Sequence, residues 1–133
     1  MVEGRCNCSS VIFAIDIEPK DIFVCHCSIC RRWTGNSGVA VIIVPKDKFR
    51  WMTGEEQVMC WTKPDADWQS WFCRTCGSAL PGANDDLNMF VPAGLIKSNT
   101  ANLRIAHHIW VGSKASWDEI SGDAKLHLEE FQN

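Results

Sequence analysis

Closely spaced cysteines are the feature that most constrains this chain. Eight cysteines occur among 133 residues, and seven of them fall into short groups. These groups are Cys6-x-Cys8, Cys25-x-Cys27-x-x-Cys30 and Cys73-x-x-Cys76. The N-terminal sequence MVEGRC has neither the basic start nor the apolar stretch of a secretory signal, which argues against a disulfide framework. The pattern therefore favours metal ligation in a reducing cytosol.

The pair Cys73 and Cys76 is the strongest of the cysteine motifs and is expected to supply two ligands of one metal site. Two intervening residues let one tight turn direct both sulfurs at one ion, and Gly77 permits the positive φ that closes such a turn. Cys6 and Cys8 place their sulfurs on one side of an extended or turning segment. Together the four thiols predict a closed, tetrahedral structural zinc site. The same spacing also fits an iron–sulfur site, and metal-free buried cysteines are another alternative. A thioredoxin-like redox role for Cys73 and Cys76 is weaker, because no βαβ pattern surrounds them.

The group of Cys25, Cys27 and Cys30 supplies three further thiolates. Three protein ligands and one open position are typical of a catalytic zinc, because a water or a substrate thiol can then bind the ion and lose its proton more easily. Alternatively, Cys60 or His26 closes the site as a fourth ligand. His26 is the poorer candidate because adjacent residues on a strand point to opposite faces. Cys60 lies in the apolar run VMCW, where a core thiol is expected.

Composition and length predict one globular domain that spans residues 1–133. Charged residues are 22% and hydrophobic residues 46% of the chain, which is a globular balance. A net charge of -3 provides no basic surface for nucleic acid. No window approaches the roughly 18 apolar residues of a membrane span. We therefore expect a cytoplasmic protein that binds neither nucleic acid nor a membrane.

Short runs rich in β-branched and aromatic residues, separated by turn residues, predict an all-β fold. The expected strands cover residues 11–17, 39–44, 49–52, 58–62, 68–73 and 104–111. Ser116 and Glu119 have the spacing of a capping box, which predicts a short helical turn. Tryptophans in the expected strands either wall a pocket or fill the core, and we expect the core.

The order of these motifs resembles that of the glutathione-dependent formaldehyde-activating enzyme family, which includes centromere protein V. The residues that carry the resemblance are Gly4-Arg5-Cys6-Asn7-Cys8, Cys25-His26-Cys27-Ser28-Ile29-Cys30-Arg31-Arg32 with Gly35, Phe72-Cys73-Arg74-Thr75-Cys76-Gly77-Ser78, and His108-Ile109 with Trp117. The resemblance implies a β-tent of stacked antiparallel sheets, with one structural and one catalytic zinc ion per chain. Ser9 departs from the family pattern, since many members carry glycine there, and a serine fits if its φ is ordinary.

The resemblance further implies a carbon–sulfur lyase that acts on a thiol adduct such as S-hydroxymethylglutathione, formed from glutathione and formaldehyde. The catalytic zinc would be held by Cys25, Cys27 and Cys30. Arg31 and Arg32 could bind carboxylates of such a peptide thiol, although a solvated basic surface explains them equally well. The alternative function is a noncatalytic, zinc-stapled module that binds a protein partner. A fourth protein ligand at the three-cysteine group would favour that alternative.

Overall fold

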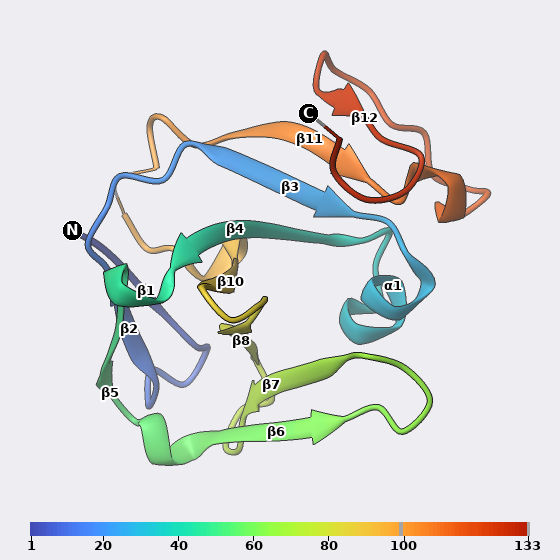
Figure 1. Cartoon of the computed structure of the whole chain (residues 1–133). Coiled ribbons are helices and arrows are strands. Elements are labelled where there is room, and N and C mark those ends of the chain that lie inside the picture. Colours follow the sequence, from blue (N-terminus) through green and yellow to red (C-terminus); the bar gives the residue numbers. More distant parts are fainter. Residues whose placement is uncertain (99, 133) are drawn as a thin grey trace.

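The fold is known from a computed structural model that describes residues 1–98 and 100–132. Within these residues the chain forms short strands in three sheets and a single α-helix, α1 (Ser28–Thr34) (Figure 1). The all-β prediction is confirmed. No helix in the described part of the chain is long and apolar enough to cross a bilayer.

The first sheet contains β1 (Val2–Arg5), β2 (Ile12–Ile15) and β5 (Phe49–Thr53), in that order and antiparallel. The third sheet contains β6 (Val58–Thr62), β7 (Gln69–Cys73) and β8 (Ala79–Leu80), also antiparallel. The predicted strand at 58–62 is therefore confirmed to the residue.

The second sheet is the largest of the three. Its six strands, in spatial order, are β12 (Lys125–Leu126), β11 (Arg104–Ile109), β3 (Asp21–Cys25), β4 (Val39–Pro45), β10 (Asn88–Pro92) and β9 (Gly82–Ala83). β11 runs parallel to both of its neighbours, so this sheet is mixed, whereas its other pairings are antiparallel. Short 3-10 helices occupy Lys46–Lys48, Glu55–Gln57, Ala93–Leu95 and Val111–Ser113.

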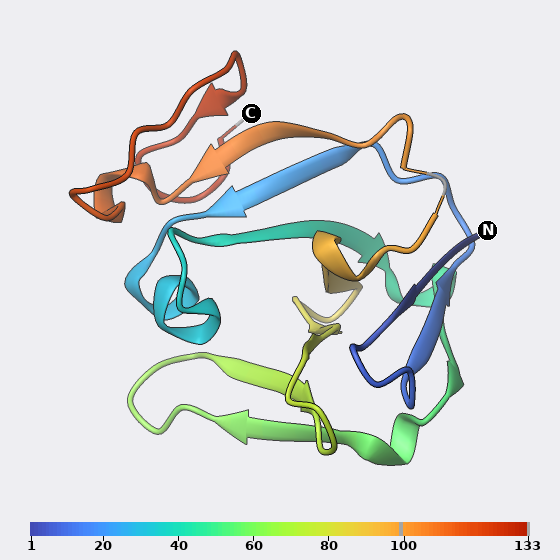
Figure 2. The same ribbon diagram turned by 180° about the vertical axis from the view of Figure 1, so that it is seen from behind.

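The three sheets enclose the core as the sides of a tent. In Figures 1 and 2, β3, β4 and β11 cross one side, the β6–β7 hairpin lies opposite, and β1, β2 and β5 form the end away from α1. Phe13, Ile15 and Val44 are fully buried where the first sheet meets the second. Gly4 permits this packing, because a Cβ at this position would lie 2.3 Å from the Phe13 ring. The tent shape follows from burying one face of each sheet against the others.

Two local predictions were incomplete. Helix α1 was not expected, although Gly35 directly after a basic last turn is a common helix C-cap, and Gly35 does end α1 at a φ of 69°. The helical turn expected at Ser116 and Glu119 is wrong. Residues 116–117 form a simple turn in which the Asp118 amide donates to the Ala115 carbonyl at 3.1 Å, and the chain then continues without helical bonds.

Candidate metal centres and catalytic site

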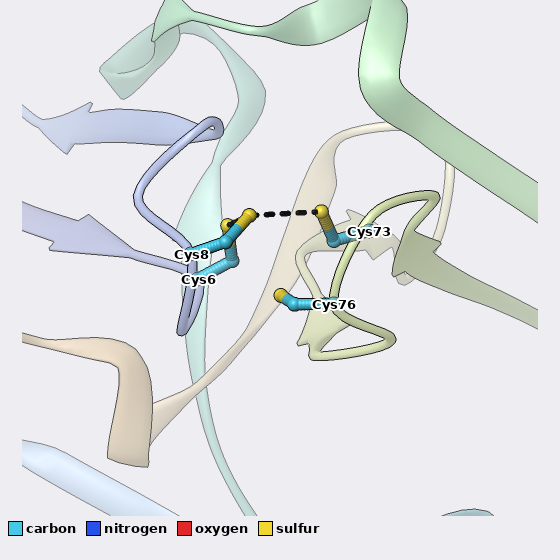
Figure 3. A group of neighbouring side chains, drawn as sticks. All are labelled: Cys6, Cys8, Cys73 and Cys76. Carbon is cyan, nitrogen blue, oxygen red and sulfur yellow. Dashed lines mark hydrogen bonds between the residues drawn. The ribbon is translucent and has the colours of Figure 1, made fainter.

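The four-cysteine group joins two turns that lie far apart in the sequence. Cys6 and Cys8 lie in the turn between β1 and β2, while Cys73 ends β7 and Cys76 lies in the turn before β8 (Figure 3). One ligand atom from each of the four lies within 4.8 Å of the others. The Cys6 amide donates to the Val11 carbonyl at 3.1 Å, which closes the first turn. The structure thus brings together the four residues that the sequence assigned to one site.

The sulfur spacing fits a tetrahedral zinc ion. Bonds of about 2.3 Å at tetrahedral angles place neighbouring sulfurs about 3.8 Å apart. The Sγ atoms of Cys6 and Cys8 are 3.6 Å apart, and those of Cys8 and Cys73 are 3.8 Å apart (Figure 3). A disulfide would require about 2.05 Å, and all eight cysteines are free. The donor set and its spacing therefore suit zinc, whose binding to these residues stays a prediction.

Two serine hydroxyls support these sulfurs, and the sequence reading missed both. Ser10 Oγ lies 3.1 Å from Cys8 Sγ and 3.5 Å from Cys73 Sγ. Ser78 Oγ lies 3.2 Å from Cys76 Sγ, and this hydrogen bond lowers the pKa of the Cys76 thiol to about 5. Hydrogen bonds of this kind favour the thiolate, which is the form that binds metal. Ser78 was visible in the CGS motif, but its distance to sulfur depends on the folded turn.

The backbone of both turns enters the left-handed region. Gly77 has a φ of 76°, as its sequence position predicted, and its amide donates to the Cys73 carbonyl at 2.8 Å. Ser9 has a φ of 64°, so the condition of an ordinary φ under which a serine fits here without strain is not met. The Ser9 amide donates to the Cys6 carbonyl at 3.0 Å, and this turn places Ser9 in the left-handed region that glycine adopts most easily.

The three-cysteine group lies where β3 meets α1. Cys25 is the last residue of β3, Cys27 is the N-cap of α1, and Cys30 lies in its first turn. The Cys30 amide donates to Cys27 Sγ at 3.3 Å. One ligand atom from each cysteine lies within 4.8 Å of the other two. A strand end followed directly by a capped helix therefore turns all three sulfurs towards one point.

The three cysteines hold their protons unequally because hydrogen bonds among their side chains favour one thiolate, and repulsion between like charges adds to this difference. Hydrogen bonds from the thiols of Cys25 and Cys30 favour the Cys27 thiolate and hold its pKa far below the usual range. The contact with Cys27 raises the pKa of Cys25 to about 11. Contact with Cys25 and Cys27 also raises the pKa of Cys30. The protein alone thus stabilises one negative charge here, and a dication would offset the repulsion of three.

Neither alternative fourth ligand joins this group. His26 Nε2 lies 2.8 Å from His108 Nδ1, and His26 Nδ1 lies 3.5 Å from a carboxylate oxygen of Asp118. Among the residues that the structure describes, the metal-ligand group at Cys25 contains three side chains. Cys60 lies on β6, the edge strand of the third sheet, and its side chain is exposed. The prediction of a core thiol at Cys60 is wrong because one face of this edge strand is open to solvent.

The adjacent histidines of β11 have partners that the sequence did not reveal. His108 contacts His26, as described above, and His107 Nδ1 lies 3.1 Å from His127 Nε2. Both contacts depend on the parallel pairing of β11 with β3 and β12. The partners are 82 residues from His108 and 20 residues from His107, so local sequence patterns could not predict these contacts.

A cavity of about 330 Å³ opens beside the three-cysteine group, with Cys25 and Cys30 in its wall. Arg32 lies in the wall of a second cavity, together with Lys63 and Trp61. The two cavities share Trp33 and Trp68 as a partition. Arg31 is half-buried and lines neither cavity. Arg31 and Arg32 follow Cys30 directly in the sequence. In the structure, however, neither arginine lines the cavity that contains Cys25 and Cys30.

Comparison with known proteins identifies the family of this chain. The profile of the glutathione-dependent formaldehyde-activating enzyme family matches residues 1–113. The chain belongs to this family. A protein of Halomonas elongata, whose provisional name is that of the same family, is 27% identical over 132 residues, which cover 90% of this chain and 81% of that protein. The match confirms the resemblance that the motifs suggested.

A solved structure supports the fold. The crystal structure of a Rhodobacter sphaeroides protein superposes with a TM-score of 0.60 at 22% sequence identity, covering 72% of this chain and 88% of that one. At this identity the similarity shows the fold alone. Family membership implies a small thiol as partner, and the two cysteine groups could each hold a metal ion.

Proposed function

We propose that the chain is a zinc-dependent carbon–sulfur lyase that forms or cleaves the adduct of a small thiol with an aldehyde. S-hydroxymethylglutathione is the adduct suggested by the family's name. The observation that carries the proposal is the three-cysteine group itself. Within residues 1–98 and 100–132 this group has three ligand side chains, and two of them line a cavity. A site with three protein ligands that faces a cavity can admit a substrate atom as its fourth ligand.

The two cysteine groups would have separate tasks. Cys6, Cys8, Cys73 and Cys76 would hold a structural ion that joins the β1–β2 turn to the β7–β8 turn. Cys25, Cys27 and Cys30 would hold the catalytic ion, and we propose two zinc ions per chain on this basis. A cytoplasmic location belongs to the same proposal, supported by eight free cysteines.

The proposed reaction needs no oxidant or reductant. A thiol sulfur forms a bond to the carbonyl carbon, the carbonyl π bond breaks, and the oxygen takes up the proton that the thiol has lost. A bound zinc ion would supply the positive charge that favours the thiolate of the incoming thiol. The chain's own contribution is to hold that charge at the cavity wall, since β3 fixes Cys25 and the capped helix fixes Cys27 and Cys30. The apolar wall would limit access of water.

The noncatalytic binding module receives less support from this geometry. A fourth protein ligand at the three-cysteine group would have favoured it. Cys60 is exposed on β6, and the His26 ring contacts His108 and Asp118. The arrangement of these two residues therefore favours the enzyme.

The test combines a spectrum with an exchange rate. Protein loaded with Co²⁺ should show a changed sulfur charge-transfer band when glutathione is added, and unloaded protein should show none. NMR exchange spectroscopy should show faster interconversion of ¹³C-formaldehyde and S-hydroxymethylglutathione with the zinc protein than in buffer. Cys27→Ser should abolish both effects, while Cys60→Ser, at an exposed cysteine outside both groups, should leave them unchanged. An unchanged cobalt spectrum together with the uncatalysed exchange rate would contradict the proposal.

A further inference from the structure

The cavity beside the three-cysteine group is strongly apolar. Five aromatic side chains line it: Phe23, Trp33, Trp68, Phe90 and Phe131. The other lining residues are Cys25, Cys30, the aliphatic residues Val39, Val41, Ile43 and Ile109, and a single amide, Asn84. Among the described residues, no charged side chain lines this wall. Such a surface favours apolar ligand atoms and disfavours ionised groups.

The size of the cavity also exceeds what formaldehyde needs. A water molecule occupies roughly 30 Å³ of liquid, so a space of about 330 Å³ corresponds to about eleven waters. The hydroxymethyl group from formaldehyde has only two heavy atoms. The carboxylates of glutathione are no better match, because the cationic side chains of Arg32 and Lys63 line a separate cavity. A substituent of ring size fits both the volume and the chemistry of the wall.

The C-terminal segment completes this wall. Phe131 packs edge-on against Phe23, with ring centroids 5.6 Å apart, and against His107 at 4.9 Å. The segment is fixed by backbone hydrogen bonds, since the Trp110 amide donates to the Glu129 carbonyl at 2.7 Å and the Gly112 amide to the Leu128 carbonyl at 3.1 Å. Phe131 lies beyond residues 1–113, which match the family profile. One aromatic part of the cavity is therefore supplied by sequence outside the matched region.

We propose that the aldehyde handled at the three-cysteine group carries an apolar, ring-sized substituent, which lies in this cavity against Phe131. The inference rests on the proposed function and specifies its substrate class. The reaction remains the addition of a thiol sulfur to a carbonyl carbon, and only the group on that carbon changes. Charged parts of the thiol would stay outside the apolar wall.

Two measurements test the substrate class. The first is the specificity constant for hemithioacetal formation from glutathione, measured with phenylacetaldehyde and with formaldehyde. We expect phenylacetaldehyde to be preferred by about tenfold or more, the discrimination that a few buried apolar atoms provide. The second uses 2-phenylethanol, which cannot form the adduct. It should shift the indole N–H resonances of Trp33 and Trp68 but not that of Trp117, which is 69% exposed and outside the cavity.

A matched pair of variants locates the effect. Phe131→Ala removes an aromatic ring that is 41% exposed and near the chain end, so the fold should persist, as circular dichroism would show. This variant should lower the preference for phenylacetaldehyde by about tenfold and weaken the 2-phenylethanol shifts. Leu128→Ala removes a side chain of the same segment that is 75% exposed and does not line the cavity. It should behave as the unmodified protein does.

The possible failures are distinguishable. Equal or better use of formaldehyde, without indole shifts from 2-phenylethanol, would overturn the substrate class and leave the lyase proposal standing. If neither aldehyde reacts faster than in buffer, the lyase proposal fails. In that case indole shifts that depend on Phe131 would still support an apolar ligand of ring size, and their absence would overturn that as well.

Discussion

The two positive-φ turns at the four-cysteine site allow a paired test of backbone strain. Ser9 has a φ of 64°, and its exposed hydroxyl has no hydrogen-bond partner within the described residues. An L-residue in the left-handed region costs about 1–2 kcal/mol. Glycine avoids this cost but loses about 0.5–1 kcal/mol more conformational entropy on folding. Ser9→Gly should therefore raise the free energy of unfolding by about 0.5–1 kcal/mol, or the melting temperature by about 2–4 °C.

The reverse substitution should have the opposite sign. Gly77 has a φ of 76°, and a Cβ there would meet no atom within 4 Å, so Gly77→Ala introduces strain without a clash. We expect a loss of about 0.5–1 kcal/mol. Gly94→Ala is the control, because its Cβ would also meet nothing within 4 Å but its φ is not positive. That variant should be neutral or gain up to about 1 kcal/mol.

Urea denaturation at one fixed, saturating concentration of free zinc provides the measurement, because metal binding itself adds to the apparent stability. The free energy of unfolding should be lower for Gly77→Ala than for the unmodified protein and higher for Ser9→Gly. For Gly94→Ala it should be equal to that of the unmodified protein or slightly higher. The reasoning would be refuted if Ser9→Gly destabilised the fold while Gly77→Ala was as harmless as Gly94→Ala. Such a result would mean that contacts of the side chains, and not the backbone angle, control these turns.

Three further outcomes are expected. Elemental analysis of protein purified without chelator should find two zinc ions per chain, and a single ion or bound iron would count against the two-site scheme. Cys73→Ser should lower the melting temperature more than Cys30→Ser, because a closed site contributes its binding free energy directly to the fold. Burial first, and then the charge of His26, lower the pKa of folded His108 from 6.5. The contribution of neutral His108 to stability is therefore complete above pH 6.5 and is lost as the pH falls below this value. The free energy of unfolding, measured by urea denaturation, should consequently fall less between pH 6.5 and 5 in His108→Gln than in the unmodified protein.

The sequence by itself determined the local chemistry of the site. Short spacings between cysteines limit where sulfurs can lie, so the division into four and three thiols, and the left-handed Gly77, could be predicted. The strand over Val58–Thr62 was equally predictable, because a short run rich in β-branched and aromatic residues and bounded by turn residues is a local signal.

Tertiary structure decided everything that depends on which segments meet. Cys60 is exposed because β6 is an edge strand, which its apolar neighbours in the sequence could not reveal. His108 reaches His26 through the parallel pairing of β11 with β3. Phe131 reaches the cavity of Cys25 because the chain end returns along β11. Burial, hydrogen-bond partners and cavity walls all depend on residues that are distant in sequence, and only the packed fold brings those residues together.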